Sequence, residues 1–153
     1  MTIEIIEITK AEDLQAAWAI RKEVFVVEQA CAEDLEWEHE EESTHFLALL
    51  NGVHAGTARY RTTDNGIKLE RFAVLKNARN KGIGAALVQR LLRELTNRSE
   101  MIYLHAQLTA KGLYAKFGFR EKGEHFWEAG IEHVKMVWHS EPKSLKPENL
   151  RQG

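Results

Sequence analysis

The chain has 153 residues, of which 44% are hydrophobic and 29% charged, and its formal net charge at neutral pH is −2. This length supports one ordinary domain, and the composition excludes a disordered or fibrous chain. The longest apolar runs fall far short of the roughly 20 residues that a membrane-spanning helix needs. One cysteine, Cys31, and the lack of a leader-like segment before the first polar residues favour a cytoplasmic protein.

The charge distribution is uneven along the chain. Residues 33–42 contain seven acids and no Lys or Arg, so the remainder holds 21 basic and 16 acidic residues, a net charge of +5. The acidic block is either a solvated loop or a surface that attracts a cationic substrate, and the basic remainder suits an anionic ligand. Lys and Arg do not alternate with aromatic residues in a stripe, and neither CxxC nor HExxH occurs, so we expect no nucleic acid partner and no metal.

The first third of the chain predicts a strand followed by a helix. Isoleucines in 2–9 indicate the strand, and Thr9 with Glu12 three residues later forms a capping-box pattern. The helix that follows carries an apolar stripe and should bend in the β-branched stretch 24–27. The stripe consists of Leu14, Ala17, Trp18 and Phe25.

The middle of the chain predicts three consecutive antiparallel strands over 46–50, 53–62 and 67–75. The pair Asn51-Gly52 accepts the positive φ angles of a tight hairpin turn, and 64–66 supplies a second turn. The hydrophobic period then becomes helical over 83–95.

The remaining elements are a strand at 101–106, a short helix at 109–116 and a strand pair at 119–124 and 131–138. Together the elements predict an α/β fold with a mixed six- to seven-stranded sheet and about four helices. We assign 1–139 to a single domain and expect a disordered tail at 140–153.

A glycine loop between the strand at 67–75 and the helix at 83–95 carries the functional signal. Its pattern is Arg-x-x-Gly-x-Gly, formed by Arg79, Gly82 and Gly84. Backbone N–H groups at the start of a helix bind phosphate, and glycines let the backbone approach a pyrophosphate closely. The loop lacks the Gly-Lys-Ser/Thr ending of a Walker loop and the third glycine of a dinucleotide-binding turn. A glycine-rich helix start without a ligand stays open on this pattern alone.

Residues 69–87 resemble the acyl-coenzyme A motif of the GCN5-related N-acetyltransferase (GNAT) family. A second match follows, because Gln107-x-x-Ala110-x-x-x-Tyr114-x-x-x-Gly118-Phe119 is similar to the family's Asn-x-x-Ala-x-x-x-Tyr-x-x-x-Gly-Phe, with glutamine in place of asparagine. The segments 21–29 and 128–136 resemble a bacterial subgroup of small, uncharacterised members. The resemblance implies a sheet that splays open between its fourth and fifth strands.

The resemblance also implies the coenzyme contacts. The backbone of the strand at 67–75 would hold the pantetheine arm, with the Val74 amide on the thioester oxygen, and the loop 79–85 would hold the pyrophosphate. The cofactor-binding residues are Phe72, Ala73, Val74, Arg79, Asn80, Lys81, Gly82, Ile83, Gly84, Ala85 and Gln107.

The implied chemistry is acetyl transfer from acetyl-CoA to a primary amine by direct attack. An amine of pKa ~10.4 must lose a proton first, so a general base is useful. Glu70 matches the position of a base glutamate in polyamine-acetylating members, and alternation would place it on one face with Phe72 and Val74. The alternative role of Glu70 is that of a cross-strand salt-bridge partner. Glu28 is a reserve candidate, a water chain is another possibility, and Tyr114 would donate to the leaving thiolate.

Two readings of function therefore stand beside each other. The first is an N-acetyltransferase acting on a small-molecule or peptide amine, which the acidic block suggests is cationic. The alternative is a non-catalytic or regulatory acyl-CoA-binding module. The sequence leaves open an acyl group other than acetyl. An acidic acyl group such as succinyl would need a cation beside it, and Arg71 should face away from Glu70, so no such site is clear. The protein is expected to be a monomer or a homodimer. His105 and His133 lie on predicted strands within reach of the cleft, where each either takes a direct part or is only a hydrogen-bonded neighbour.

Overall fold

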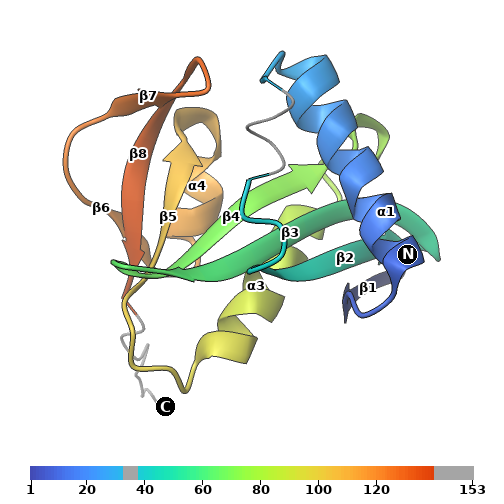
Figure 1. Cartoon of the computed structure of the whole chain (residues 1–153), viewed down its shortest axis with the longest axis horizontal. Coiled ribbons are helices and arrows are strands. Elements are labelled where there is room, and N and C mark those ends of the chain that lie inside the picture. The colour runs from blue at the N-terminus through green and yellow to red at the C-terminus, as the bar shows by residue number, and fades with distance from the viewer. Residues whose placement is uncertain (33–37, 140–153) are drawn as a thin grey trace.

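A computed structural model of the chain describes residues 1–32 and 38–139 (Figure 1). The predicted tail at 140–153 and residues 33–37 of the acidic block lie outside these described residues. The elements are β1 (Ile3–Glu7), α1 (Ala11–Arg21), η1 (Lys22–Glu28), β2 (Thr44–Leu50), β3 (Val53–Thr63), β4 (Gly66–Val74), η2 (Lys76–Ala78), α3 (Ile83–Leu95), β5 (Ile102–Gln107), η3 (Leu108–Ala110), α4 (Lys111–Ala115), β6 (Phe119–Glu121), β7 (Phe126–Glu128) and β8 (Ile131–Trp138).

The strands form one mixed sheet in the order β1-β2-β3-β4-β5-β8-β6, with β7 paired to β8. All neighbours are antiparallel except β4 and β5, which α3 connects as a parallel crossover. The predicted hairpin at Asn51-Gly52 is confirmed, since their φ angles are 52° and 82° and both lie in the region that a type I′ turn requires. The strand β7 was not predicted, because three residues carry too little alternation to detect.

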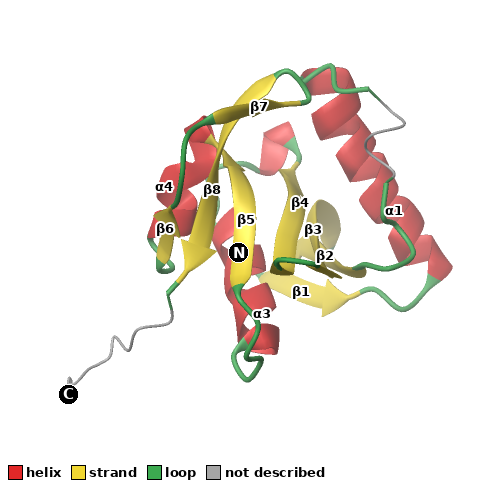
Figure 2. Cartoon of the chain, turned by 60° about the vertical axis from the view of Figure 1, so that its left-hand side comes forward, coloured by secondary structure: helices red, strands yellow, loops and turns green. Residues whose placement is uncertain are grey.

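Helices cover both faces of the sheet, and each face has its own core. Adjacent residues of β2 separate the two: Phe46 packs with α3, whereas Leu47 packs with Ile20 and Phe25 of the first helical segment. Figure 2 shows α1 on one side of β1–β4, and α3 and α4 on the other. The described residues contain three α-helices, α1, α3 and α4, one fewer than the four expected.

The first helical segment departs from the prediction in three ways. The capping box is wrong, because Lys10 is the N-cap residue of α1 and makes no side-chain capping bond. The α-helical turns end at Arg21 and continue as the π-helical η1, so the change precedes the β-branched stretch. Trp18 remains 38% exposed, while Arg21 is 1% exposed. Hydrophobicity alone therefore misassigned the buried face, which holds an arginine.

Among the described residues, no helix combines the length and the apolar character needed to cross a membrane.

Candidate active site

The sheet opens between β4 and β5. Their parallel pairing covers Ile67 with Ile102, Lys68 with Tyr103 and Leu69 with Leu104. Beyond Leu104, β5 stays paired with β8 on its far side, while β4 stays paired with β3. The two strands consequently diverge toward the top of the view in Figure 1. This confirms the splay expected between the fourth and fifth strands.

A β-bulge in β4 lies where the opening begins. Arg59 of β3 pairs with Glu70 and Thr57 pairs with Ala73, so β4 carries one extra residue in this interval. The extra residue is Arg71, whose φ angle is +58°. The prediction that Glu70, Phe72 and Val74 share a face is wrong, because the extra residue reverses the alternation. Phe72 and Val74 pack against the core on the α3 face, while Ala73 belongs to the core under α1.

The bulge also turns backbone amides into the opening. Before it, the Ile67 N–H donates to Met101 O at 2.8 Å, toward β5. After it, the Leu75 N–H donates to Ala55 O at 2.9 Å, toward β3. Since backbone groups alternate along a strand, the amides of Phe72 and Val74 face the gap. Without the extra residue these two amides would point toward β3.

The predicted phosphate loop runs from β4 into α3. Gly82 is the N-cap residue of α3, has φ +89° and provides no side chain to cap the helix. The first N–H groups of the helix, at 83–85, therefore have no partner within the helix. A Cβ on Gly84 would lie 3.3 Å from Leu113 Cδ2, so glycine permits close packing of α3 against α4.

Arg79 in this loop already has two partners. Its Nε donates to Val74 O at 2.9 Å, and its two terminal nitrogens donate to the carboxylate of Glu28 at 2.9 and 2.6 Å. This hydrogen bonding lowers the pKa of Glu28. Glu28, the reserve base candidate, therefore joins η1 to the phosphate loop, and it is not among the residues that line the pocket.

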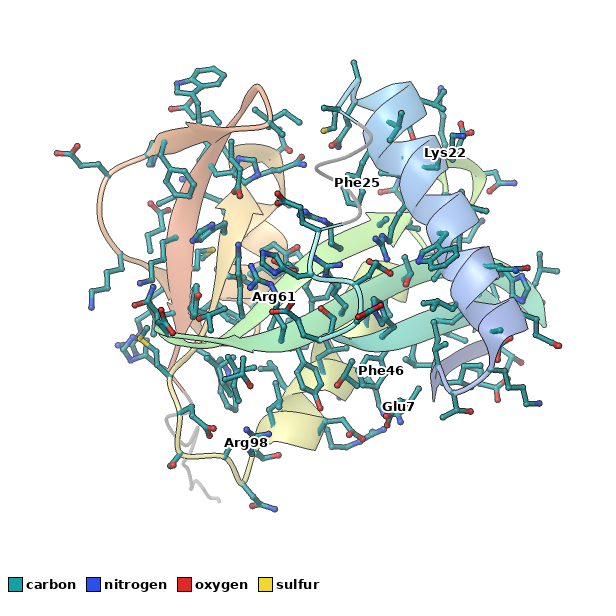
Figure 3. All side chains as sticks on the ribbon, viewed as in Figure 1. Glu7, Lys22, Phe25, Phe46, Arg61 and Arg98 are labelled. Carbon is teal, nitrogen blue, oxygen red and sulfur yellow. The ribbon has the colours of Figure 1, made fainter. Side chains whose placement is uncertain are left out.

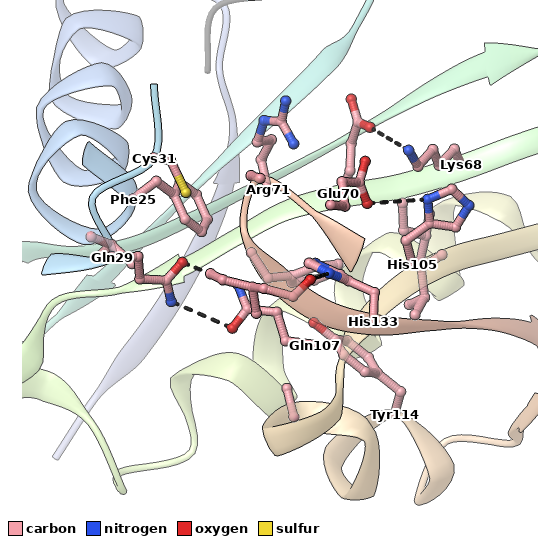
Figure 4. Close-up of a pocket in the computed structure, with 18 residues that line it drawn as sticks. Phe25, Gln29, Cys31, Lys68, Glu70, Arg71, His105, Gln107, Tyr114 and His133 are labelled. Carbon is pink, nitrogen blue, oxygen red and sulfur yellow. Dashed lines mark hydrogen bonds and ion pairs between the residues drawn. The ribbon is translucent and has the colours of Figure 1, made fainter. Parts of the chain in front are cut away.

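A pocket fills the opening between the two halves of the sheet (Figure 4). Phe25 points into it from η1 (Figure 3). Its walls come from η1 and the following loop, β4, β5, α4 and the turn between β7 and β8. The residues that line it include Gln29, Lys68, Glu70, Arg71, Phe72, His105, Gln107, Tyr114, Glu128 and His133. The expectation that Arg71 faces away from Glu70 is wrong, since the bulge places both on the pocket wall.

Gln107 and Tyr114, both predicted from the second motif, meet at this pocket. Gln107 exchanges side-chain hydrogen bonds of 3.1 and 3.4 Å with Gln29, which ties the end of β5 to the residue following η1 (Figure 4). Tyr114 reaches the pocket from α4 and makes an edge contact with Phe72, with ring centroids 5.5 Å apart. Burial raises the pKa of the Tyr114 phenol. The hydroxyl is therefore a hydrogen-bond donor rather than a strong acid.

Glu70 is held by cations on every side. Its Oε2 accepts hydrogen bonds from Arg59 Nε at 2.7 Å and Arg61 Nε at 2.9 Å, and Lys68 Nζ lies 3.4 Å from Oε1. Burial of this carboxylate would raise its pKa, but the positive charges, with Arg59 foremost, outweigh burial and lower the pKa to about 2. Such a carboxylate is ionised at neutral pH and binds a proton weakly, which makes it a poor general base.

The charge network continues away from the pocket to Glu40. Arg59 NH1 donates to Glu40 Oε1 at 2.7 Å, Trp18 Nε1 donates to Oε2 at 2.6 Å, and Arg21 donates to both oxygens. Arg21 and Arg59 are each only 1% exposed. Glu40 therefore neutralises two buried guanidinium groups, so this member of the acidic block is neither solvated nor available to a cationic substrate.

The wall formed by β5, β7 and β8 carries His105 and His133, which the sequence placed within reach of the cleft, and Glu128, which the sequence patterns did not assign to the site. His105 Nδ1 lies 3.4 Å from Glu128 Oε1, and His105 together with Lys68 lowers the pKa of Glu128 to about 2. His133 Nδ1 lies 2.7 Å from Ile131 O. The sequence feature that indicates a turn after Glu128 is the Ala129-Gly130 pair. These residues have φ angles of 52° and 78° and form the turn between β7 and β8 at the pocket. No comparable sequence feature marks Gln29.

Comparison with known proteins agrees with this geometry. Residues 8–140 match the family model of the acetyltransferase (GNAT) domain. A Bacillus subtilis relative with a provisional acetyltransferase name is 38% identical over 136 residues, which cover 86% of this chain and 92% of that protein. A splayed mixed sheet with a helix-start loop and a pocket in the gap defines an acyltransferase-type architecture. The chain belongs to the GNAT acetyltransferase family.

Solved structures share the fold. The crystal structure of Escherichia coli ElaA has a TM-score of 0.78 and 25% identity, and the match covers 90% of this chain and all of that one. A GNAT family acetyltransferase from Elizabethkingia anophelis, solved with acetyl-CoA bound, has a TM-score of 0.65 and 20% identity over 88% of this chain and 94% of that one.

Proposed function

We propose that this protein is an acetyl-CoA-dependent N-acetyltransferase that moves the acetyl group to a primary amine by direct attack within a ternary complex. The observation that carries the proposal is the line of backbone donors from the gap to the helix start. The amides of Phe72 and Val74 in β4 face the opening. The loop that follows β4 leads into the start of α3, whose first N–H groups have no capping side chain. The acetyl-CoA bound by the Elizabethkingia relative supports this choice of donor.

The residues present fit the coenzyme. The loop residues 79–85 would hold the pyrophosphate through the free N–H groups at the start of α3 and through the charges of Arg79 and Lys81. The amides of Phe72 and Val74 would receive the pantetheine arm, with Ala73 and Gln107 beside it. When bound, acetyl-CoA supplies the activated thioester carbonyl.

Two groups of the chain would act on the thioester. The Val74 N–H, which faces the gap, would stabilise the negative charge that develops on the thioester oxygen. The buried Tyr114 hydroxyl would donate a hydrogen bond to the departing thiolate, because its raised pKa disfavours full proton transfer. Glu70 is assigned a structural part, since it lines the pocket and holds Arg59, Arg61 and Lys68 in place.

The acceptor enters from the face shared by η1 and the turn between β7 and β8. The ionised Glu128 supports an acceptor that arrives as an ammonium ion, and it replaces the acidic block as the reason for expecting a cationic amine. The expected cytoplasmic location and the monomeric or homodimeric state stay predictions.

The test is calorimetric titration with acetyl-CoA together with thiol release over a panel of primary amines. We expect micromolar binding and amine-dependent thiol release. Gly82→Asp should weaken binding more than tenfold. Gly52→Asp is the matched control, because Gly52 has a similar positive φ of 82° in a distant hairpin and a Cβ there meets nothing within 4 Å. Binding without thiol release for any amine would favour the acyl-CoA-binding module. A lack of binding would refute both.

A further inference from the structure

We propose that the imidazole of His133 is the general base of this active site and that its Nε2 atom takes the proton from the acceptor ammonium. The inference rests on the proposed function and deepens it, because it names the group that makes the amine nucleophilic.

The carboxylates considered from the sequence are unsuited to this task. Glu70 is surrounded by Arg59, Arg61 and Lys68, and these cations stabilise its ionised form so strongly that it would not take a proton from an ammonium ion. Glu28 is paired with Arg79 at the phosphate loop and lies outside the pocket lining. A base must come from elsewhere on the pocket wall or from solvent.

His133 lies beside the open end of the gap between β4 and β5, where the acetyl group would be bound. In the register of β5 and β8 it is directly opposite Gln107, the last residue of β5. Side chains of such a cross-strand pair lie on the same face and close together. Gln107 marks the place where the pantetheine arm would pass, so His133 borders the position of the acetyl group. Figure 4 shows the imidazole extending into the pocket from the wall that carries His105.

The surroundings of His133 fix its orientation and its tautomer. The 2.7 Å contact between Nδ1 and Ile131 O requires Nδ1 to carry the hydrogen, because a carbonyl oxygen only accepts. The neutral ring therefore has its lone pair at Nε2. The ring is 8% exposed and stacks on Phe126 at 5.9 Å with an interplanar angle of 21°. An imidazole held in one orientation with a free lone pair is arranged as a general base.

His105 on the same wall provides a natural comparison. Its Nδ1 faces Glu128 Oε1 at 3.4 Å, and its ring meets Phe126 edge-on at 5.0 Å. It follows Leu104, the last residue of β5 that pairs with β4, so it lies at the closed end of the gap. We assign His105 to holding Glu128 rather than to the reacting amine.

Several charged or titratable groups line the pocket with His133 and share its environment. They are Cys31 from the loop after η1, His105 from β5, Glu128 from β7, Tyr114 from α4, and Lys68, Glu70 and Arg71 from β4. Among these groups, Glu128 is the anion on the strand next to His133, because β7 pairs directly with β8. Its charge would favour both the incoming ammonium and the imidazolium that forms.

The proton balance of the step is as follows. The ammonium gives one proton to His133 Nε2, and the resulting amine attacks the thioester carbon, so that a C–N bond forms and the C–S bond breaks. The attacking nitrogen loses a second proton, which ends on the departing sulfur as the free thiol. The His133 imidazolium then releases its proton to solvent. The products are the amide, coenzyme A and one proton, and no oxidant or metal is required.

The experiment compares the wild type with His133→Gln, His133→Asn and His105→Gln. For an amine that the wild type accepts, the pH profile of kcat/KM should have an acidic limb, because His133 takes a proton only when its ring is neutral. Both His133 variants should lose that limb and about 10²- to 10⁴-fold in kcat, while acetyl-CoA affinity by calorimetry and the urea midpoint stay near those of the wild type. His105→Gln should keep the limb.

The outcomes separate the inference from the function on which it rests. If the wild type binds and turns over but the His133 variants keep its pH profile, the inference is overturned and the enzyme stands. If the pH profile of kcat/KM for the wild type lacks the acidic limb, the inference is also overturned. That result does not depend on whether a variant folds. If the wild type transfers acetyl to none of the amines, the proposed function fails and the inference fails with it.

Discussion

Replacement of Glu70 by glutamine should destabilise the protein far more than its near-isosteric shape suggests. The substitution removes a negative charge that faces Arg59, Arg61 and Lys68, and Glu70 itself is only 7% exposed. Three cations would then share a buried site without their common anion. Removal of one partner from a buried ion pair typically costs about 3–5 kcal/mol.

The pKa of Glu70 gives an independent magnitude. Its ordinary pKa of 4.5 falls to about 2 in the fold, and at 1.36 kcal/mol per pH unit this difference corresponds to about 3 kcal/mol of stability. Because the pKa is lowered by folding, this contribution is fully present above about pH 4.5. It is lost as the pH falls toward 2, where the folded protein also binds the proton. The stability gap between the wild type and Glu70→Gln should therefore close in acid.

Urea unfolding of both proteins from about pH 7 down to about pH 3 measures this gap. Glu100→Gln is the matched control, because Glu100 pairs with Arg98 at 2.8 Å on the surface, and we expect no measurable change in its midpoint. A Glu70→Gln variant within about 1 kcal/mol of the wild type, or a gap that stays constant with pH, would refute the argument. If such a stable variant lost catalysis instead, Glu70 would regain its place as the base.

Three further predictions concern the coenzyme and the leaving group. Gly82→Ala should weaken folding by only about 1–2 kcal/mol through its positive φ, whereas Gly82→Asp should also weaken coenzyme A binding more than tenfold in calorimetry, because it adds a negative charge beside the pyrophosphate. Tyr114→Phe should lower kcat in the thiol-release assay roughly 10- to 100-fold at unchanged acetyl-CoA affinity, as expected for loss of one hydrogen bond to a charged group. Glu28→Gln should tighten coenzyme A binding at low salt, since Arg79 would no longer be neutralised, and an unchanged or weaker affinity would contradict that competition.

Local patterns in the sequence predicted much of the framework. Asn51-Gly52 specified a hairpin because few residues other than glycine and asparagine tolerate two successive positive φ angles, and the stripe from Ile83 to Leu95 specified α3. The candidate phosphate loop and Tyr114 followed from motifs that resemble those of the GNAT family. In each case the information lies within one continuous stretch of chain.

Pairings between distant charges could not be predicted in this way. Arg21, Glu40 and Arg59 are separated by 19 residues at each step, and their mutual neutralisation explains why two arginines are buried. Periodicity treats arginine as a surface residue, so the exposed Trp18 was assigned to the core in place of Arg21. The expectation for the acidic block failed at Glu40 for the same reason, because a carboxylate is solvated or buried according to partners that only the fold supplies.

The bulge at Arg71 is the feature on which the candidate mechanism depends most. One additional residue in β4 places Glu70 among the cations of the α1 face and turns the amides of Phe72 and Val74 into the gap. The same residue therefore provides the backbone donors for the thioester and removes the carboxylate that strict alternation would have set beside it. Since β4 then offers amides but no basic carboxylate, the base that we propose lies on the opposite wall. There His133 is level with the end of β5 and holds its Nε2 lone pair toward the pocket.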